Sequence, residues 1–227
     1  MSANPRSPLQ TLVVRTAPRR RSLDANVVTY EPLKRVIDLL GIALLAPLAL
    51  TIIAILALLI RRDGGSAFYC QPRLGKDGKI FNLWKLRTMV PDADRKLQDY
   101  LDTNPAARIE WDTTQKLKDD PRITSIGKYL RKYSLDELPQ LLNVGLGQMS
   151  LVGPRPMMPN QRAYYPGTAY FDMRPGLTGL WQISERNEST FAERALYDNR
   201  YAAIMSLGTD LWVLSKTLTV VLRGTGL

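Results

Sequence analysis

Histidine is absent from this sequence of 227 residues, and cysteine occurs once, as Cys70. A single cysteine excludes an internal disulfide and favours a reducing compartment. The missing histidine argues against a Ser-His-Asp triad, a Cys-His pair and a zinc site built from cysteine and histidine. Any catalysis therefore has to use carboxylates, lysine, arginine, tyrosine or hydroxyl groups.

Acidic residues are scarce relative to basic ones: 21 Asp and Glu stand against 31 Lys and Arg, which gives a formal net charge of +10. This excess predicts an anionic partner, which is a membrane surface, a nucleic acid or a phosphorylated small molecule. The length fits one domain with additions. Residues 1–30 combine prolines with basic residues and predict a flexible tail, either disordered or held electrostatically to anionic lipid.

One long stretch lacks charge altogether, from Leu39 to Ile60. About 20 apolar residues suffice to cross a bilayer, so we predict a membrane helix over residues 31–62. Pro47, after Ala46, predicts a kink near the middle. Basic residues flank both ends, and cytoplasmic flanks are the ones enriched in Lys and Arg. The residues alone leave two arrangements open: a re-entrant helix that bends at Ala46 and Pro47, and a kinked spanning helix.

The remaining residues, 63–227, are predicted to form a cytosolic catalytic domain. Between Ser66 and Met89 the pattern changes to period two around a glycine-bounded turn, which predicts a β-hairpin. Its second strand ends with Lys85 and Arg87 on one face. These two side chains either form a solvated surface or contact a phosphate. The expected fold class is α+β, mainly α.

A helix is predicted at the C-terminus, where leucines and a valine recur at helical spacing from Leu211 to Leu222. Packing on the catalytic core is one interpretation of this apolar stripe. A helix that lies in the membrane interface, with Trp212 as its aromatic anchor, is the other.

Two adjacent carboxylates, Asp136 and Glu137, follow Ser134 at the start of an apolar stretch. Aspartate is ionised at neutral pH and can act as a nucleophile without histidine. A neighbouring glutamate suits a hard cation such as Mg²⁺. Ser134 and Glu137 also fit a capping box, in which the acidic residues only stabilise a helix N-terminus. Both interpretations stay open on the residues alone.

Three arginines occur in contexts that suit phosphate binding. Arg131 belongs to a basic cluster just before the carboxylates, Arg155 is held between two prolines, and Arg174 opens an Arg-Pro turn. Arginine favours bidentate phosphate contacts, although each of these residues alone also fits a solvated surface.

The run Ser134–Val144, followed by Met149–Pro156, resembles the bacterial sugar transferase family. The resemblance is to its small monotopic polyprenyl-phosphate phosphoglycosyl transferases of exopolysaccharide synthesis. It covers roughly residues 30 to 227, with further matches in Lys34–Asp38, Lys85–Met89, Asp120–Thr124 and Arg174–Gln182.

The resemblance implies transfer of hexose-1-phosphate from a UDP-sugar, with UDP-galactose or UDP-glucose favoured, to undecaprenyl phosphate, releasing UMP. This is the first step of exopolysaccharide repeat-unit assembly. It implies a covalent phosphosugar intermediate on Asp136, and Mg²⁺ held by Glu137 together with Asp136. Substrate phosphates would be bound by Lys85, Arg87, Arg131, Arg155 and Arg174.

The resemblance also implies a bent membrane helix with both ends cytoplasmic, so the catalytic domain and its interfacial helices face the cytoplasm at the bacterial inner membrane. The partners would be the UDP-sugar, undecaprenyl phosphate and membrane lipids, with no nucleic acid and a homodimer as an open option. Many family members have serine where this chain has Ala46, so we expect no hydroxyl bond at the bend. Leu146 and Gln148 replace a basic and an acidic residue, which removes an acidic metal contact at 148.

Two other functions compete with this one. A membrane-tethered nucleic-acid-binding protein would account for the charge and would bind DNA in a salt-dependent way, but it gives no role to Asp136 and Glu137. A non-catalytic membrane scaffold of a polysaccharide assembly complex would tolerate replacement of Asp136.

Overall fold

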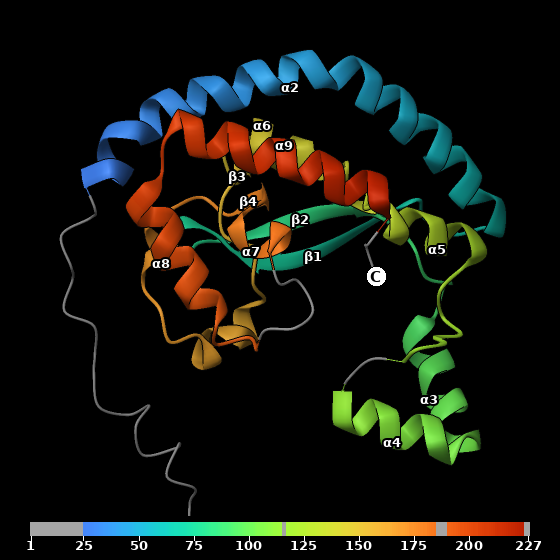
Figure 1. Cartoon of the computed structure of the whole chain (residues 1–227). Coiled ribbons are helices and arrows are strands. Elements are labelled where there is room, and N and C mark those ends of the chain that lie inside the picture. Colours follow the sequence, from blue (N-terminus) through green and yellow to red (C-terminus); the bar gives the residue numbers. More distant parts are fainter. Residues whose placement is uncertain (1–24, 115–116, 185–189, 225–227) are drawn as a thin grey trace, which may run out of the picture.

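The computed structural model describes residues 25–114, 117–184 and 190–224. Its α-helices are α2 (Ala25–Ile60), α3 (Ala93–Thr103), α4 (Pro105–Thr114), α5 (Ser125–Lys132), α6 (Gln140–Gly145), α7 (Leu180–Ile183), α8 (Arg194–Ile204) and α9 (Leu207–Arg223) (Figure 1). The strands are β1 (Phe68–Leu74), β2 (Ile80–Leu86), β3 (Ser150–Val152) and β4 (Gly176–Thr178). Short 3₁₀ helices are η1 (Arg61–Asp63), η2 (Lys76–Gly78), η3 (Leu135–Glu137), η4 (Pro159–Tyr164) and η5 (Ala169–Asp172). The predicted α+β, mainly α class is confirmed.

Strands β1 and β2 form the predicted hairpin, antiparallel and paired over all seven residues of each strand. The turn uses positive φ angles at Asp77 (58°) and Gly78 (72°), a region open to glycine and tolerated by aspartate. A second, parallel pair joins β3 to β4, with Ser150 opposite Gly176. The sequence does not reveal this pair, because strands of three residues are too short to show a period of two.

The main core lies between α2, the hairpin, α6, β3, α8 and α9. Val144, Met149 and Val213 are fully buried in it. Asn143, on α6, is also fully buried. Its amide donates to the carbonyl of Asn82 at 2.8 Å and accepts from the backbone N–H of Trp84 at 3.1 Å. These bonds fasten α6, and with it the preceding turn of η3, to strand β2.

Helix α2 arches over the rest of the protein above α6 and α9 (Figure 1). One stripe of the helix packs on the body, from Val27 at its start to Ile60 at its end. The opposite stripe is exposed, with Leu44 81% and Leu58 70% accessible. Residues Thr29–Asp63 are long and apolar enough to cross a membrane, and only 6% of the most apolar window is buried. A core helix of a soluble protein buries most of its length, so this exposure favours lipid contact.

The helix continues unbroken through Pro47, and Figure 1 shows it as a curved arch. The hydroxyl of Thr51 donates to the carbonyl of Pro47 at 2.9 Å. The expectation that no hydroxyl bond supports this region is therefore wrong, because a threonine one turn later supplies one. The re-entrant path through a membrane stays a prediction.

The N-terminal end of α2 is fixed to the body by a buried ion pair between Lys34 and Asp210 of α9. The hydroxyls of Tyr30 and Tyr201 also donate to the carboxylate of Asp210, at 3.1 and 2.6 Å. Because Val27 and Tyr30 are buried, the helix begins inside the stretch predicted as a tail. Residues 1–24 of that tail lie outside the described residues.

Candidate active site

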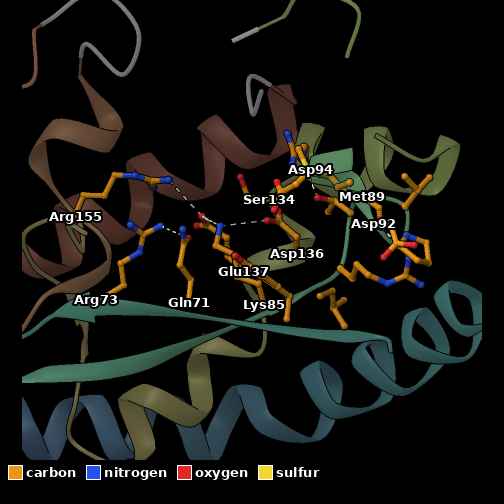
Figure 2. Close-up of a pocket in the computed structure, with 18 of the residues that line it drawn as sticks. Gln71, Arg73, Lys85, Met89, Asp92, Asp94, Ser134, Asp136, Glu137 and Arg155 are labelled. Carbon is orange, nitrogen blue, oxygen red and sulfur yellow. Dashed lines mark hydrogen bonds and ion pairs between the residues drawn. The ribbon is translucent and has the colours of Figure 1, made fainter. Parts of the chain in front are cut away.

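A cleft of about 1050 Å³ opens beside the hairpin, on the face away from α2 (Figure 2). Its walls come from β1 and β2, the segment from Leu86 to Arg95, and η3. Arg131, Ser134, Arg155, Trp181 and Arg194 complete the lining. Sugar nucleotides fit a volume of this size, since ligand pockets commonly measure about 300–1000 Å³.

The chain turns sharply into η3 at Ser134, whose φ of 54° lies in the left-handed region. The Ser134 side chain makes no capping bond. The capping-box interpretation of Ser134 and Glu137 is therefore wrong: α6 begins later, after Pro139. This turn presents both carboxylates to the cleft.

Asp136 and Glu137 share one cation, Lys85 of strand β2. The Lys85 ammonium lies 3.3 Å from Oδ2 of Asp136 and 2.9 Å from Oε1 of Glu137. Arg155 approaches the same Glu137 oxygen at 3.5 Å. Asp136 is only 8% exposed, and this burial raises its pKa, while the Lys85 and Arg131 charges oppose the rise. The cations thus favour the ionised carboxylate that a nucleophile needs.

Arg131 reaches the cleft from α5, where its Nε donates to the hydroxyl of Thr88 at 2.9 Å. Six of the seven residues predicted to act on substrate therefore line one cleft: Lys85, Arg87, Arg131, Asp136, Glu137 and Arg155.

Arg87 lines the cleft, but its guanidinium is engaged by protein acceptors. It forms an ion pair with Asp63 and donates to the carbonyls of Ser66 (2.6 Å), Met89 (2.9 Å) and Ile60 (3.3 Å). These contacts hold the end of α2 against the end of β2. The phosphate-binding role predicted for Arg87 has no support in this arrangement.

Arg174 is not among the residues that line the cleft. Its guanidinium donates to the carbonyl of Gly147 at 2.9 Å and pairs with Glu31 of α2 at 2.7 Å. The structure thus places Arg174 against α2 and outside the cleft lining, and its phosphate contact stays a prediction. Gln148 is likewise structural, since its side-chain oxygen accepts from the Asn143 amide at 2.7 Å.

Arg73, Trp181 and Arg194 are among the cleft residues that the sequence did not predict. The sequence does contain a signal for Arg73. Alternate residues of a strand share one face, so Arg73 lies on the same face as Tyr69, and Tyr69 stands opposite Lys85 in the hairpin. Trp181 and Arg194 come from distant parts of the chain, and no local pattern indicates that they meet Asp136.

Asp198 lies behind Arg194 on α8 and is buried, with the hydroxyl of Tyr165 donating to it at 2.6 Å. Burial raises its pKa to about 7, against about 3.9 in an unfolded chain. Between these values the folded protein keeps a proton that the unfolded chain releases, so its contribution to the free energy of unfolding falls as pH rises. We expect Asp198→Asn to flatten the decline of Tm between about pH 5 and pH 7 relative to wild type.

Thermal unfolding at several pH values checks this, with Asp112→Asn on the exposed face of α4 as the control. Equal slopes for wild type and Asp198→Asn would show that Asp198 titrates normally.

The fold and the cleft define a class of protein: a mainly helical chain that carries one exposed apolar helix and a cation-lined pair of carboxylates. The bacterial sugar transferase family model matches residues 29–224, and the chain belongs to this family. The predicted family and the prediction of a transferase enzyme are confirmed.

The exopolysaccharide production protein ExoY of Sinorhizobium fredii is 48% identical over 197 residues, which cover 85% of this chain and 87% of that protein. The UDP-galactose-lipid carrier transferase of Erwinia amylovora is 46% identical over 196 residues, 86% of this chain. The undecaprenyl-phosphate galactose phosphotransferase of Salmonella typhimurium is 43% identical over 196 residues. The chain spans only 41% of the length of each of the last two.

Proposed function

We propose that this protein transfers hexose-1-phosphate from a UDP-sugar to undecaprenyl phosphate and releases UMP, as the first step of exopolysaccharide repeat-unit assembly. The observation that carries the proposal is Asp136, a buried carboxylate in a cleft among Lys85, Arg131 and Arg155. Relatives named for galactose are 46% and 43% identical, and one named undecaprenyl-phosphate glucose phosphotransferase, from Komagataeibacter xylinus, is 35% identical. This order favours UDP-galactose as the donor.

The chemistry is two displacements at one phosphorus atom. A carboxylate oxygen of Asp136 attacks the sugar-linked phosphorus, the bond to the bridging oxygen breaks, and UMP leaves with the bonding electrons. A phosphate oxygen of undecaprenyl phosphate then attacks the same phosphorus, and the bond to Asp136 breaks. Both nucleophiles are already anionic, so neither step needs a general base. A chain without histidine can therefore carry out the whole reaction.

The cations around η3 supply the electrostatic stabilisation of the reacting phosphates. A carboxylate approaching a diphosphate is repelled by it, and this repulsion has to be offset before attack. Lys85 and Arg131 lie beside Asp136, and Arg155 lies beside Glu137. Their side chains are positioned to donate to phosphoryl oxygens without further folding of the site.

Mg²⁺ is the metal that we propose for this site. Asp136 and Glu137 supply two adjacent carboxylates, and no cluster of three or more His, Cys, Asp or Glu that could hold a metal occurs within residues 25–114, 117–184 and 190–224. One or two carboxylates completed by substrate phosphates match the usual Mg²⁺ site in phosphoryl transfer. When bound, the ion would neutralise charge on the phosphates.

The membrane arrangement that we propose is a re-entrant α2 in the inner membrane with residues 63–227 on the cytoplasmic face. Both ends of α2 contact the same body, through Lys34 at one end and Ile60 at the other, as a helix that returns to its starting side requires. The Ile60 end packs in one cluster with Leu135, the neighbour of Asp136. A lipid phosphate at the headgroup level would therefore lie close to the catalytic turn.

The test is UMP release by the purified full chain in detergent with Mg²⁺. A panel of UDP-sugars would be supplied with and without undecaprenyl phosphate. We expect UMP release that depends on the lipid and is fastest with UDP-galactose or UDP-glucose. No release with any donor would favour the scaffold function. UMP release at the same rate with and without undecaprenyl phosphate would indicate hydrolysis of the UDP-sugar instead.

A further inference from the structure

A second group of cations lies at one end of the cleft, apart from the pair of Lys85 and Arg131. It consists of Arg73 on β1, Arg155 after β3, and Arg194 at the start of α8. Arg194 is stacked 4.1 Å above the ring of Trp181, which is 7% exposed. The stack holds the guanidinium in one orientation toward the cleft.

These arginines have too few counter-charges. Among the described residues, neither Arg73 nor Arg194 forms an ion pair with a carboxylate, and Arg155 meets only Glu137, at 3.5 Å. Nε of Arg194 is buried and has no hydrogen-bond partner within residues 25–114, 117–184 and 190–224. Burial and the charge of Arg155 lower the pKa of Arg194 to about 10 and lower that of Arg73. A buried donor without a partner costs free energy that a bound anion would offset.

The arginine group lies to one side of the catalytic turn. Figure 2 shows Arg73 and Arg155 on one side of Asp136, while the C-terminal end of α2 lies toward the other side. The cluster of Ile60, Leu130 and Leu135 joins that end of α2 to the catalytic turn. The arginine group therefore lies on the side of Asp136 away from that end of α2.

We propose that Arg73, Arg155 and Arg194 form a subsite for the phosphate of the leaving nucleoside monophosphate, with Trp181 positioning Arg194. This rests on the proposed function. When the bond from the sugar-linked phosphorus to the bridging oxygen breaks, the electron pair stays on that oxygen and adds negative charge to the departing phosphate. Three guanidiniums at that point stabilise the new charge by hydrogen bonds to its oxygens.

The test compares the binding of UMP and uridine, which differ only in the phosphate, to the full chain in detergent. Arg194→Ala is expected to raise the Kd for UMP about tenfold or more, since a hydrogen bond to a charged group is worth that much, and to leave the Kd for uridine unchanged. Arg162→Ala is the matched control, because Arg162 also stacks on an aromatic ring, Phe171, at 4.9 Å, but lies outside the cleft lining. It should alter neither Kd. If Arg194→Ala fails to fold, Arg194→Lys, which keeps the charge, replaces it in the same UMP and uridine binding measurements.

The two half-reactions supply an independent readout. Arg194→Ala should slow the formation of the phosphosugar-enzyme, because UMP departs in that step. An unchanged Kd for UMP, or an unchanged rate of phosphosugar-enzyme formation, would overturn the proposal. UMP binding needs no turnover. If wild type forms no covalent intermediate while Arg194→Ala still loses UMP affinity, the subsite stands and the two-step mechanism fails.

Discussion

Asp136→Asn is expected to lower kcat for UMP release by about 10⁴-fold or more, the loss typical of removing an enzyme's nucleophile. An amide of nearly the same shape cannot attack phosphorus, and its oxygen still accepts from Lys85. Because the substitution removes a carboxylate that is only 8% exposed and whose pKa is raised by burial, Tm should stay level or rise. The measurement is kcat for UMP release together with Tm for each variant.

Asp112→Asn, an exposed change of the same chemistry on α4, is the matched control and should retain full activity. A loss of kcat in Asp136→Asn accompanied by a large drop in Tm would point to a structural role for Asp136. Full activity in Asp136→Asn would show that Asp136 is not the nucleophile.

Asp210→Ala is expected to destabilise the protein by about 3–5 kcal/mol, the cost of breaking a buried ion pair from one side. Asp210 is 3% exposed and Lys34 is 7% exposed. The substitution leaves the Lys34 ammonium and the hydroxyls of Tyr30 and Tyr201 without their acceptor. Since these bonds join the start of α2 to α9, α2 should also become accessible to protease near Lys34. Denaturant unfolding in detergent measures the change.

Asp102→Asn is the control for this prediction, because its ion pair with Arg108 is exposed, and such pairs contribute at most about 1 kcal/mol. A double change, Lys34→Met with Asp210→Leu, should recover much of the lost stability, since an apolar pair often replaces a buried ion pair without loss. A change below about 1 kcal/mol in Asp210→Ala would show that the ion pair does not hold α2.

Local patterns predicted the features that depend on neighbours in the chain. The hairpin follows from alternating residues around a turn, and Asp136 and Glu137 reach the cleft as their position beside one another suggested. Arg155, held by its flanking prolines, also faces that cleft. Where nearby residues determine the backbone, the sequence is sufficient to place the side chain.

Pairings across the chain could not be predicted in the same way. Arg87 was expected to bind phosphate, but it pairs with Asp63 of η1, the short helix that follows α2. Arg174 was expected near substrate, and its guanidinium pairs with Glu31 of α2. An arginine pattern shows that an anion is needed, and only the fold decides whether a protein carboxylate already supplies it.

The left-handed turn at Ser134 is a further limit, because a serine before two acidic residues has the composition of a helix cap. Its φ of 54° redirects the chain, so Glu137 meets Lys85 and Arg155 instead of the backbone of its own helix. The strain of this turn coincides with the proposed catalytic residue, as is common at functional sites.

The most direct test of the central claim is covalent labelling. The purified chain would be mixed with a UDP-sugar carrying ³²P in the phosphate next to the sugar, with undecaprenyl phosphate omitted, then quenched and analysed by peptide mass spectrometry. The account predicts label and a hexose-phosphate adduct on the peptide that contains Asp136, lost when undecaprenyl phosphate is added. If an enzyme that releases UMP in the complete reaction acquires no label in this experiment, or acquires it at another residue, Asp136 is not the nucleophile.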